Sequence, residues 1–195
     1  MNLNKIFTSH MVFAANKPIR VYGEGSGRCS ISFAGIIKEA VSYGDKWHIE
    51  FPEMKCGGPY ILTAEFEDET VVLDDIYIGE VYLFCGQSNI EFRMEETNLE
   101  PESFGSNNML RMFCADRFIN YGFFEAKHGW TVCRKEQIKY WSAVAFLASQ
   151  KIVKEKNIAV GVIVCCQGAS VIESWVPKGA FSKIGIDIPA EKKEY

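Results

Sequence analysis

The sequence predicts an α/β protein in two parts, a small antiparallel β-sandwich domain over residues 1–75 and a parallel-sheet α/β domain over residues 76–195. Three observations support this division. Strand-like runs separated by glycine-rich turns fill the first part. A strongly apolar run opens the second part, and a strand–helix–strand pattern follows it. The composition, 48% hydrophobic and 24% charged, is typical of a globular protein and not of a disordered one.

The first part is expected to form short β-strands, because its apolar runs are rich in β-branched and aromatic residues. Turn-forming residues, glycine above all, separate these runs. In Ile31-Ser32-Phe33, apolar and polar side chains alternate, which predicts one buried and one solvated face. The expected strands are 19–22, 29–34, 47–51, 60–66 and 70–73, and the expected turns are 23–27, 43–45 and 56–59.

The second part is expected to form a parallel sheet. Residues 76–84 are almost all apolar, which predicts a strand buried on both faces, and residues 158–165 predict a second such strand. Apolar residues recur at helical spacing in the segment 140–156 between them, so a βαβ unit follows. Residues 110–114 predict a further strand after a loop at 105–108. The expected apolar face of the helix consists of Trp141, Val144, Ala145, Ala148 and Ile152.

Charge and composition disfavour several classes of protein. The net charge is −4, and no run of Lys or Arg forms the basic stripe of a nucleic-acid binder. No apolar run reaches the roughly 18–20 residues of a membrane span, and the N-terminus lacks an export signal. Seven cysteines without any C-x-x-C pair argue against structural zinc and indicate reduced, mostly buried thiols. We therefore expect a cytoplasmic protein with no metal or cofactor.

A candidate nucleophile, Ser88, follows the first strand of the parallel sheet. Ligands of α/β sheets bind beyond the carboxyl ends of the strands, and Gly86 allows a tight turn there. The Ser88 N–H and the Asn89 side chain are candidate donors to an oxyanion. The motif is not a G-x-S-x-G elbow, because Ile90 stands where the second glycine would be. The alternative is that Ser88 or Asn89 only caps a short helix.

A second candidate segment follows the strand at 158–165. Gly168 allows the backbone to approach a ligand closely, and its N–H is a candidate second oxyanion donor. Glu173 and Trp175 come shortly after it. The alternative is a plain turn from strand to helix in which Ser170 caps the helix.

Together these segments resemble the sialate O-acetylesterase family of SGNH (GDSL-like) carbohydrate esterases. The nucleophile block of that family matches residues 79–91, with Ile90 in place of the usual Met. Its second block usually reads Gly-Gly-Thr before Ile-Glu-Ala-Trp, and here reads Gly-Ala-Ser before Ile-Glu-Ser-Trp over residues 168–175. Weaker matches lie at 11–23, 57–60, 141–145 and 161–163.

The resemblance implies a flavodoxin-like sheet and the hydrolysis of acetyl esters on sugars, without a metal. In that case Ser88 is the nucleophile, and Ser88, Asn89 and Gly168 form the oxyanion hole. The same resemblance assigns Gln87, Glu173 and Trp175 to substrate binding, where Glu173 and Trp175 hold the second loop or line the sugar cleft. The substrate would be an O-acetylated sugar.

A serine hydroxyl needs a general base, and the D-x-x-H block that supplies it in this family is absent. His10 and His48 lie in the first part, where each is most simply a turn or surface residue. His128 follows Glu125 by three residues, so E-x-x-H is a second possibility. We expect the chain to be the N-terminal portion of a family member, apparently truncated, with a homo-oligomer contact or a complementing C-terminal fragment covering its sheet.

Two other readings stay open. One is a non-catalytic esterase fragment that acts as a sugar-binding or assembly module. The other is a reactive thiol centre at Cys85 or at the Cys165–Cys166 pair.

Overall fold

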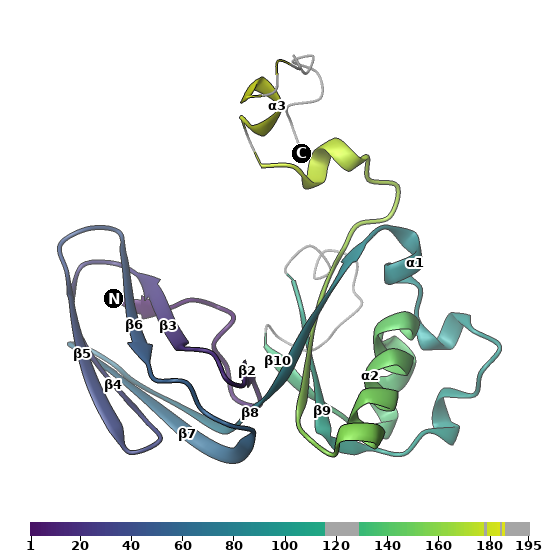
Figure 1. Ribbon diagram of the computed structural model, residues 1–195, viewed down its shortest axis with the longest axis horizontal. Helices are drawn as coiled ribbons and strands as arrows, with labels where there is room; N and C mark the ends of the chain where they lie inside the picture. Colours follow the sequence, from purple (N-terminus) through teal and green to yellow (C-terminus); the bar gives the residue numbers. More distant parts are fainter. Residues whose placement is uncertain (116–128, 178, 184, 186–195) are drawn as a thin grey trace.

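One long strand, β8 (Thr70–Gly86), runs through both halves of the molecule. The computed structural model in Figure 1 describes residues 1–115, 129–177, 179–183 and 185. The sequence predicted two separate strands at 70–73 and 76–84, but the structure joins them into β8. The domain boundary predicted after residue 75 therefore falls inside a strand. Two hydrophobic clusters flank β8, one in each half.

The first half is built from two facing sheets. A three-stranded antiparallel sheet has the order β1-β3-β6, and the opposite sheet has the order β8-β7-β4-β5, with β2 paired in parallel to β8. Alternate residues of β3 and β6 are buried, as the sandwich prediction requires. The strands are β1 (Asn2–Leu3), β2 (Val12–Ala14), β3 (Ile19–Glu24), β4 (Gly27–Phe33), β5 (Ile36–Ser42), β6 (Lys46–Phe51) and β7 (Gly57–Phe66). Strand β5 was not expected from the sequence.

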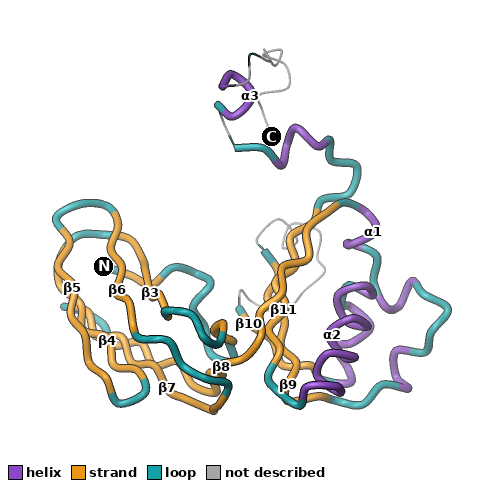
Figure 2. The backbone as a smooth tube through the Cα atoms, in the orientation of Figure 1, coloured by secondary structure: helices purple, strands orange, loops and turns teal. Residues whose placement is uncertain are grey.

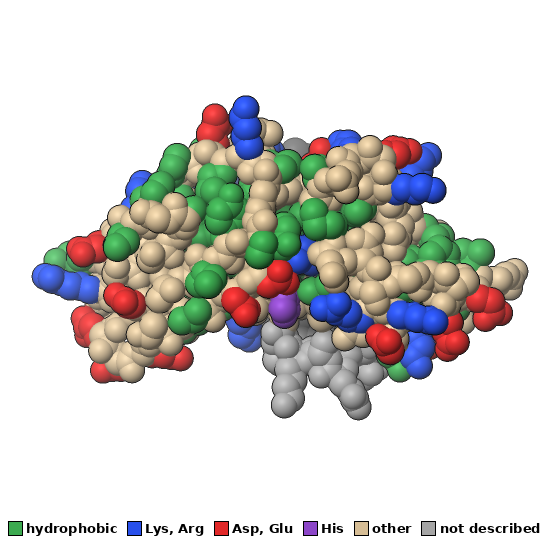
Figure 3. Space-filling model, turned by 90° about the horizontal axis from the view of Figure 1, so that it is seen from below, with side chains coloured by type: hydrophobic (Ala, Val, Ile, Leu, Met, Phe, Trp, Pro, Cys, Tyr) green, Lys and Arg blue, Asp and Glu red, His purple; other side chains and the backbone are tan. Residues whose placement is uncertain are grey.

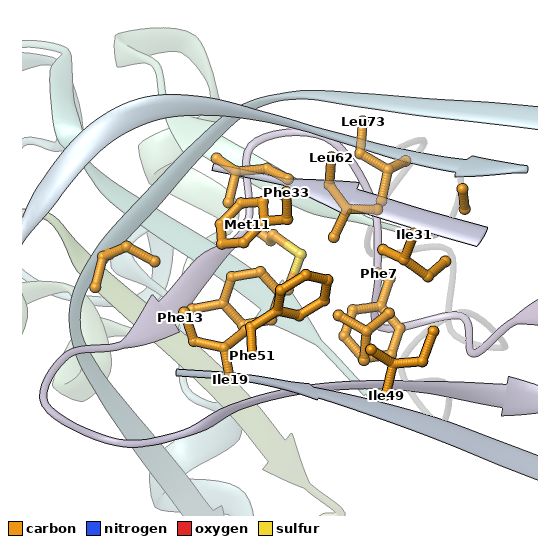
Figure 4. Close-up of a cluster of buried hydrophobic side chains, with 14 of the residues drawn as sticks. Phe7, Met11, Phe13, Ile19, Ile31, Phe33, Ile49, Phe51, Leu62 and Leu73 are labelled. Carbon is orange, nitrogen blue, oxygen red and sulfur yellow. The ribbon is translucent and has the colours of Figure 1, made fainter. Parts of the chain in front are cut away.

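The core of this half lies between the two sheets, as the close-up in Figure 4 shows. Phe33 packs its ring against those of Phe13 and Phe51, with ring centroids 5.6 and 5.8 Å apart. Ile31 and Leu62 are fully buried beside them. The predicted alternation in β4 is confirmed, because Ile31 and Phe33 point into this core while the residue between them does not.

The second half is a sheet covered by a helix on one face. Strand β11 is parallel to both β8 and β9, and β10 is antiparallel to β9. This confirms the α/β class and the predicted parallel pairing of β8 with β11, the strands that precede and follow the helix in the sequence. The elements are β9 (Asn107–Cys114), β10 (Trp130–Cys133), β11 (Val160–Cys166) and the helix α2 (Ala143–Lys156). The short helices are α1 (Ser88–Glu91), η1 (Met94–Glu96), η2 (Pro101–Ser103), η4 (Lys135–Tyr140), η5 (Ile172–Trp175) and α3 (Ala180–Lys183).

The order of the described parallel strands is β9-β11-β8. In a flavodoxin-like sheet, the first strand along the chain lies between the second and the third. Here β11, the last of the three in sequence, lies between the other two. These strands therefore establish a mixed α/β sheet but not the flavodoxin-like order that the resemblance implied.

Helix α2 begins after Ser142, whose side chain accepts a hydrogen bond from the Ala145 N–H at 3.4 Å. It ends at Asn157, which adopts the left-handed conformation with φ of 52°. The predicted apolar face was wrong in part, because Val144 is 46% exposed. The buried helix residues are Ala143, Ala145, Phe146, Ser149 and Val153, so the true face is rotated toward Phe146.

The other face of this sheet is only partly covered. Near the first half, Gly161 lets Val12 and Trp130 lie directly on the sheet, since a Cβ at position 161 would come within 2.8 Å of the Val12 Cβ. Toward the end of β8 this cover stops, and Leu83 is 63% exposed. The prediction that residues 76–84 are buried on both faces is therefore wrong for the last part of the run.

A buried ion pair ties the two halves together. Arg111, on β9, is 1% exposed and donates from Nη2 to both carboxylate oxygens of Asp75, at 3.2 and 3.1 Å. The guanidinium carbon also lies 4.1 Å from the centre of the Tyr77 ring. His10 Nδ1 lies 2.8 Å from Asp75 Oδ2. Figure 3 shows acidic, basic and histidine side chains meeting near the middle of the underside.

Candidate active site

Parallel pairing brings the two predicted segments together. Gly86 at the end of β8 lies opposite Cys166 at the end of β11, and the Gln167 N–H donates to the Gly86 carbonyl at 3.1 Å. Figure 2 shows the two strands rising together to the edge of the sheet where α1 begins. Ser88 and Gly168 each follow their strand by two residues, so both lie at this carboxyl edge.

Ser88 is the first residue of α1 and is exposed. The residue before the helix is Gln87, and no side chain caps it. The alternative that Ser88 or Asn89 is a helix cap is therefore not what the structure shows. The Ser88 hydroxyl and the N–H groups of Ser88 and Asn89 have no hydrogen-bond partner within the described chain. These polar groups, together with the exposed side chains of Gln87 and Asn89, face solvent.

The Gly168 N–H already has a partner. It donates to Glu91 Oε2 at 2.7 Å, which joins α1 to the loop after β11. A Cβ at position 168 would lie only 2.5 Å from that oxygen, so a side chain there would displace the Glu91 carboxylate. Glu91 was not among the site residues predicted from the sequence. The sequence signal was only that a carboxylate follows the candidate nucleophile by three residues, and its contact with the Gly168 loop depends on the tertiary structure.

The loop after β11 is held by a chain of hydrogen bonds. Trp175 Nε1 donates to the Ser170 hydroxyl at 2.9 Å, and that hydroxyl donates to the Gln167 carbonyl at 2.7 Å. Ser170 therefore ties the loop together and does not cap η5, which has no side-chain cap. Ala169 has a φ of 58°, in the region that favours glycine, and glycine is the residue that the family pattern has there. Glu173 is half-buried on η5.

Neither described histidine reaches Ser88. His10 is bound to Asp75, and the eleven residue-to-residue steps from Asp75 to Gly86 along β8 span about 35 Å. His48 is an exposed residue of β6, in the three-stranded sheet of the first half. His128 and Glu125 lie outside the described residues. A general base for Ser88 is thus not among the histidines that the structure describes.

The same part of the chain holds no cluster of three or more His, Cys, Asp or Glu side chains suited to a metal ion. None of the seven cysteines is in a disulfide bond. The expectation that most are buried is wrong, because only Cys29, Cys133 and Cys166 are, while Cys56 and Cys85 are exposed. No helix of the described residues is both long and apolar enough to cross a membrane.

No protein-family model and no curated protein matches the chain. Among solved structures, the chain is similar to the crystal structure of a novel carbohydrate acetylesterase from Xanthomonas citri, with a TM-score of 0.81 and 19% sequence identity. The match covers 95% of this chain and 44% of that chain. At this identity the likeness concerns the fold alone, a mixed α/β fold that this chain shares with part of the acetylesterase structure. The chain spans less than half of the acetylesterase structure.

Proposed function

We propose that this chain carries the nucleophile half of a serine carbohydrate O-acetylesterase of the sialate O-acetylesterase type. The observation that carries the proposal is the pairing of β8 with β11, which brings Ser88 beside the Gly168 loop at one edge of the sheet. The fold similarity to a carbohydrate acetylesterase supports the same class of reaction. The substrate class that we assign is an O-acetylated sugar, and no cofactor takes part.

The chemistry begins with attack of the Ser88 oxygen on the acetyl carbonyl carbon, while a base accepts the hydroxyl proton. The unpartnered N–H groups of Ser88 and Asn89 are available to the oxyanion that forms. The sugar oxygen leaves with a proton, and water then hydrolyses the acetyl–serine ester. Glu91 fixes the Gly168 loop beside this site, so Gly168 can donate to an oxyanion only when Glu91 releases it.

The reaction needs a base beyond His10 and His48, both of which lie far from Ser88. The proposal therefore assigns that base to a histidine outside the described residues or on another polypeptide. Gln87, Glu173 and Trp175 are assigned to substrate binding, because the first is exposed beside Ser88 and the other two follow the Gly168 loop.

The test is hydrolysis of p-nitrophenyl acetate and of an acetylated monosaccharide, with release of acetate as the readout for the sugar. We expect turnover by the wild-type chain that Ser88→Ala removes. Ser26→Ala is the matched control, since Ser26 is an exposed serine in a turn of the first half and should leave the rate unchanged. Turnover by the wild-type chain that Ser88→Ala does not reduce would contradict the assignment of Ser88 as the nucleophile. No turnover by either chain would leave only another polypeptide as the source of the base.

A second candidate function is a non-catalytic assembly module, and the open sheet face favours it. Leu83 is 63% exposed, and from Val81 to Gly86 no described strand pairs with the side of β8 opposite β11. A paired strand edge and a covered apolar face are the usual state of a parallel sheet. The occupant that we assign is a second copy of the chain or a complementing fragment.

Sedimentation at micromolar concentration tests this candidate. The assembly candidate predicts a dimer that Leu83→Asp converts to a monomer. It also predicts that any sugar binding survives Ser88→Ala. A wild-type chain that sediments as a monomer at every concentration would exclude self-assembly through this face.

A further inference from the structure

Two cysteines face each other across the strand ends. Cys85 on β8 and Cys165 on β11 are register partners, so their Cα atoms are separated by the spacing of neighbouring strands, about 4.8 Å. Register partners of parallel strands point to the same face of a sheet. The separation falls inside the range of roughly 4.4–6.8 Å that a disulfide bond accepts.

The two thiols lie on the open face of the sheet. Cys85 follows Leu83 by two residues, so both side chains point to the same face, where Leu83 is 63% exposed. Cys85 is itself exposed, and Cys165 is half-buried. A reagent in solution can therefore reach Cys85 directly, and Cys165 lies beside it.

The neighbouring cysteines differ from this pair. Cys114 and Cys166 belong to the opposite, helix-covered face and pack in the second hydrophobic cluster. Burial raises the pKa of each thiol to about 12, and the charge of Glu91 adds to the effect at Cys166. A thiol that stays protonated is a poor nucleophile. The four cysteines at this edge thus divide into an accessible pair and two inert residues.

We propose that Cys85 and Cys165 form a dithiol modification site, which low-molecular-weight disulfides such as glutathione disulfide oxidise to an intramolecular disulfide. The Cys85 thiolate attacks one sulfur of glutathione disulfide, forms a mixed disulfide and releases one glutathione. The Cys165 thiolate then attacks the Cys85 sulfur and releases the second glutathione. Two protein thiols are oxidised to one disulfide, and one glutathione disulfide is reduced to two glutathione molecules.

The experiment treats the native chain with glutathione disulfide, alkylates the remaining thiols and maps the peptides by mass spectrometry without reduction. We expect a cross-linked pair of peptides containing residues 85 and 165, two hydrogen atoms lighter than the separate reduced peptides. Cys85→Ser and Cys165→Ser should abolish the cross-link. Cys56→Ser is the matched control, because Cys56 is an exposed cysteine of the first half and its loss should leave the cross-link intact. A stable glutathione adduct on Cys85, or a cross-link from Cys85 to Cys114 or Cys166, would overturn the proposal.

A second measurement needs no oxidation and no variant of Cys165. Phenylarsine oxide condenses with two adjacent thiols, forming two As–S bonds and releasing one water molecule. We expect one adduct per chain that dithiothreitol removes and that prior treatment with glutathione disulfide blocks. An adduct that persists in Cys85→Ser, or the absence of any adduct on the wild-type chain, would also overturn the site. Both measurements are independent of esterase activity.

Discussion

The two halves of β8 both carry apolar side chains but have different surroundings. In the first half of the molecule, Leu73 is 7% exposed and Ile76 and Ile78 are fully buried, because a second sheet faces them. In the second half, Leu83 is 63% exposed on the same strand. Apolar side chains occur in both parts of the strand, but only those of the first part are covered by a second sheet. The comparison teaches that the sequence of a strand indicates which of its side chains are apolar but not whether another element packs on them.

The junction between the halves is polar where its flanks are apolar. Arg111 is nearly inaccessible, and its Nε and Nη1 have no hydrogen-bond partner. Its charge is balanced by Asp75 and by the face of the Tyr77 ring. This ion pair, with a buried arginine and a carboxylate that is 33% exposed, links the halves in addition to the shared strand and the contacts of Trp130. The following variants test this contrast.

The largest loss of stability is expected for Leu73→Ala, in the closed core. Removing a buried leucine side chain costs the transfer free energy and leaves a cavity, in total about 2–5 kcal/mol. Urea unfolding followed by tryptophan fluorescence measures the change. A loss under 1 kcal/mol would show that the two sheets of the first half are not packed as tightly as the structure describes.

The next largest loss is expected for Asp75→Asn, at the junction. Asn tolerates the left-handed backbone of residue 75, whose φ is 51°, so the variant changes mainly the charge. The buried Arg111 guanidinium then lacks its counter-charge, and we expect a loss of about 1–3 kcal/mol at pH 7. Arg111→Met removes the buried positive charge itself, while Asp75 keeps its contact with His10 and with water. This variant should therefore be less harmful than Asp75→Asn. The reverse order would contradict the ion-pair account.

The same variant predicts a pH dependence. Partial burial acts to raise the pKa of Asp75, but the hydrogen bonds from His10 and Arg111 outweigh it and lower the pKa below the ordinary value. A carboxyl whose pKa is lowered by folding stabilises the protein fully above its unfolded pKa of about 4 and loses that effect as the pH falls through the folded pKa. The stability difference between the wild-type chain and Asp75→Asn should therefore shrink below about pH 4. A difference that stays constant from pH 7 to pH 3 would contradict the lowered pKa.

A smaller loss is expected for Ser142→Ala, at the start of the helix that covers the second sheet. The substitution removes the acceptor of the Ala145 N–H, which costs about 1 kcal/mol. Asn157→Gly at the other end is the matched control, because glycine also accepts the left-handed conformation and should change little. Thermal unfolding by circular dichroism distinguishes the two. Equal effects at both ends would argue against the cap.

The smallest change is expected for Leu83→Ala, the counterpart of Leu73→Ala on the open face. An exposed side chain gives up little contact when it is shortened, so the loss should stay below about 0.5 kcal/mol. The urea measurement used for Leu73→Ala compares the two variants directly. A loss similar to that of Leu73→Ala would mean that another copy or partner covers this face in solution.

Much of the strand content could be predicted from the sequence, because alternation and β-branched residues mark strands such as β3 and β6. Strand β5 was missed, since Lys38 and Glu39 interrupt its apolar pattern at the edge of the sheet. The helix was placed correctly, but its buried face only in part, because Val144 and Phe146 both fit an apolar stripe by spacing. Which of them is buried depends on where β9 and β11 lie.

For the candidate site, too, the sequence predicted the segments that take part but not the contact between them. Two strand ends carrying Ser88 and Gly168 were identified from glycines after apolar runs, because parallel strands end at one edge. The contact between Glu91 and Gly168 could not be predicted, since it joins residues 77 positions apart.

The sequence by itself determined the element types, the division into a β-rich and an α/β part and the segments that meet at the strand ends, because these depend on local periodicity and on residues that lie close together in the chain. Only the tertiary structure decided that β8 is continuous, that Glu91 holds the Gly168 N–H, that Arg111 is buried against Asp75 and that Cys85 faces Cys165 beside an exposed Leu83. Each of these depends on the register between distant strands and on what covers a face of a sheet. The pattern of a single segment determines neither the register nor the cover.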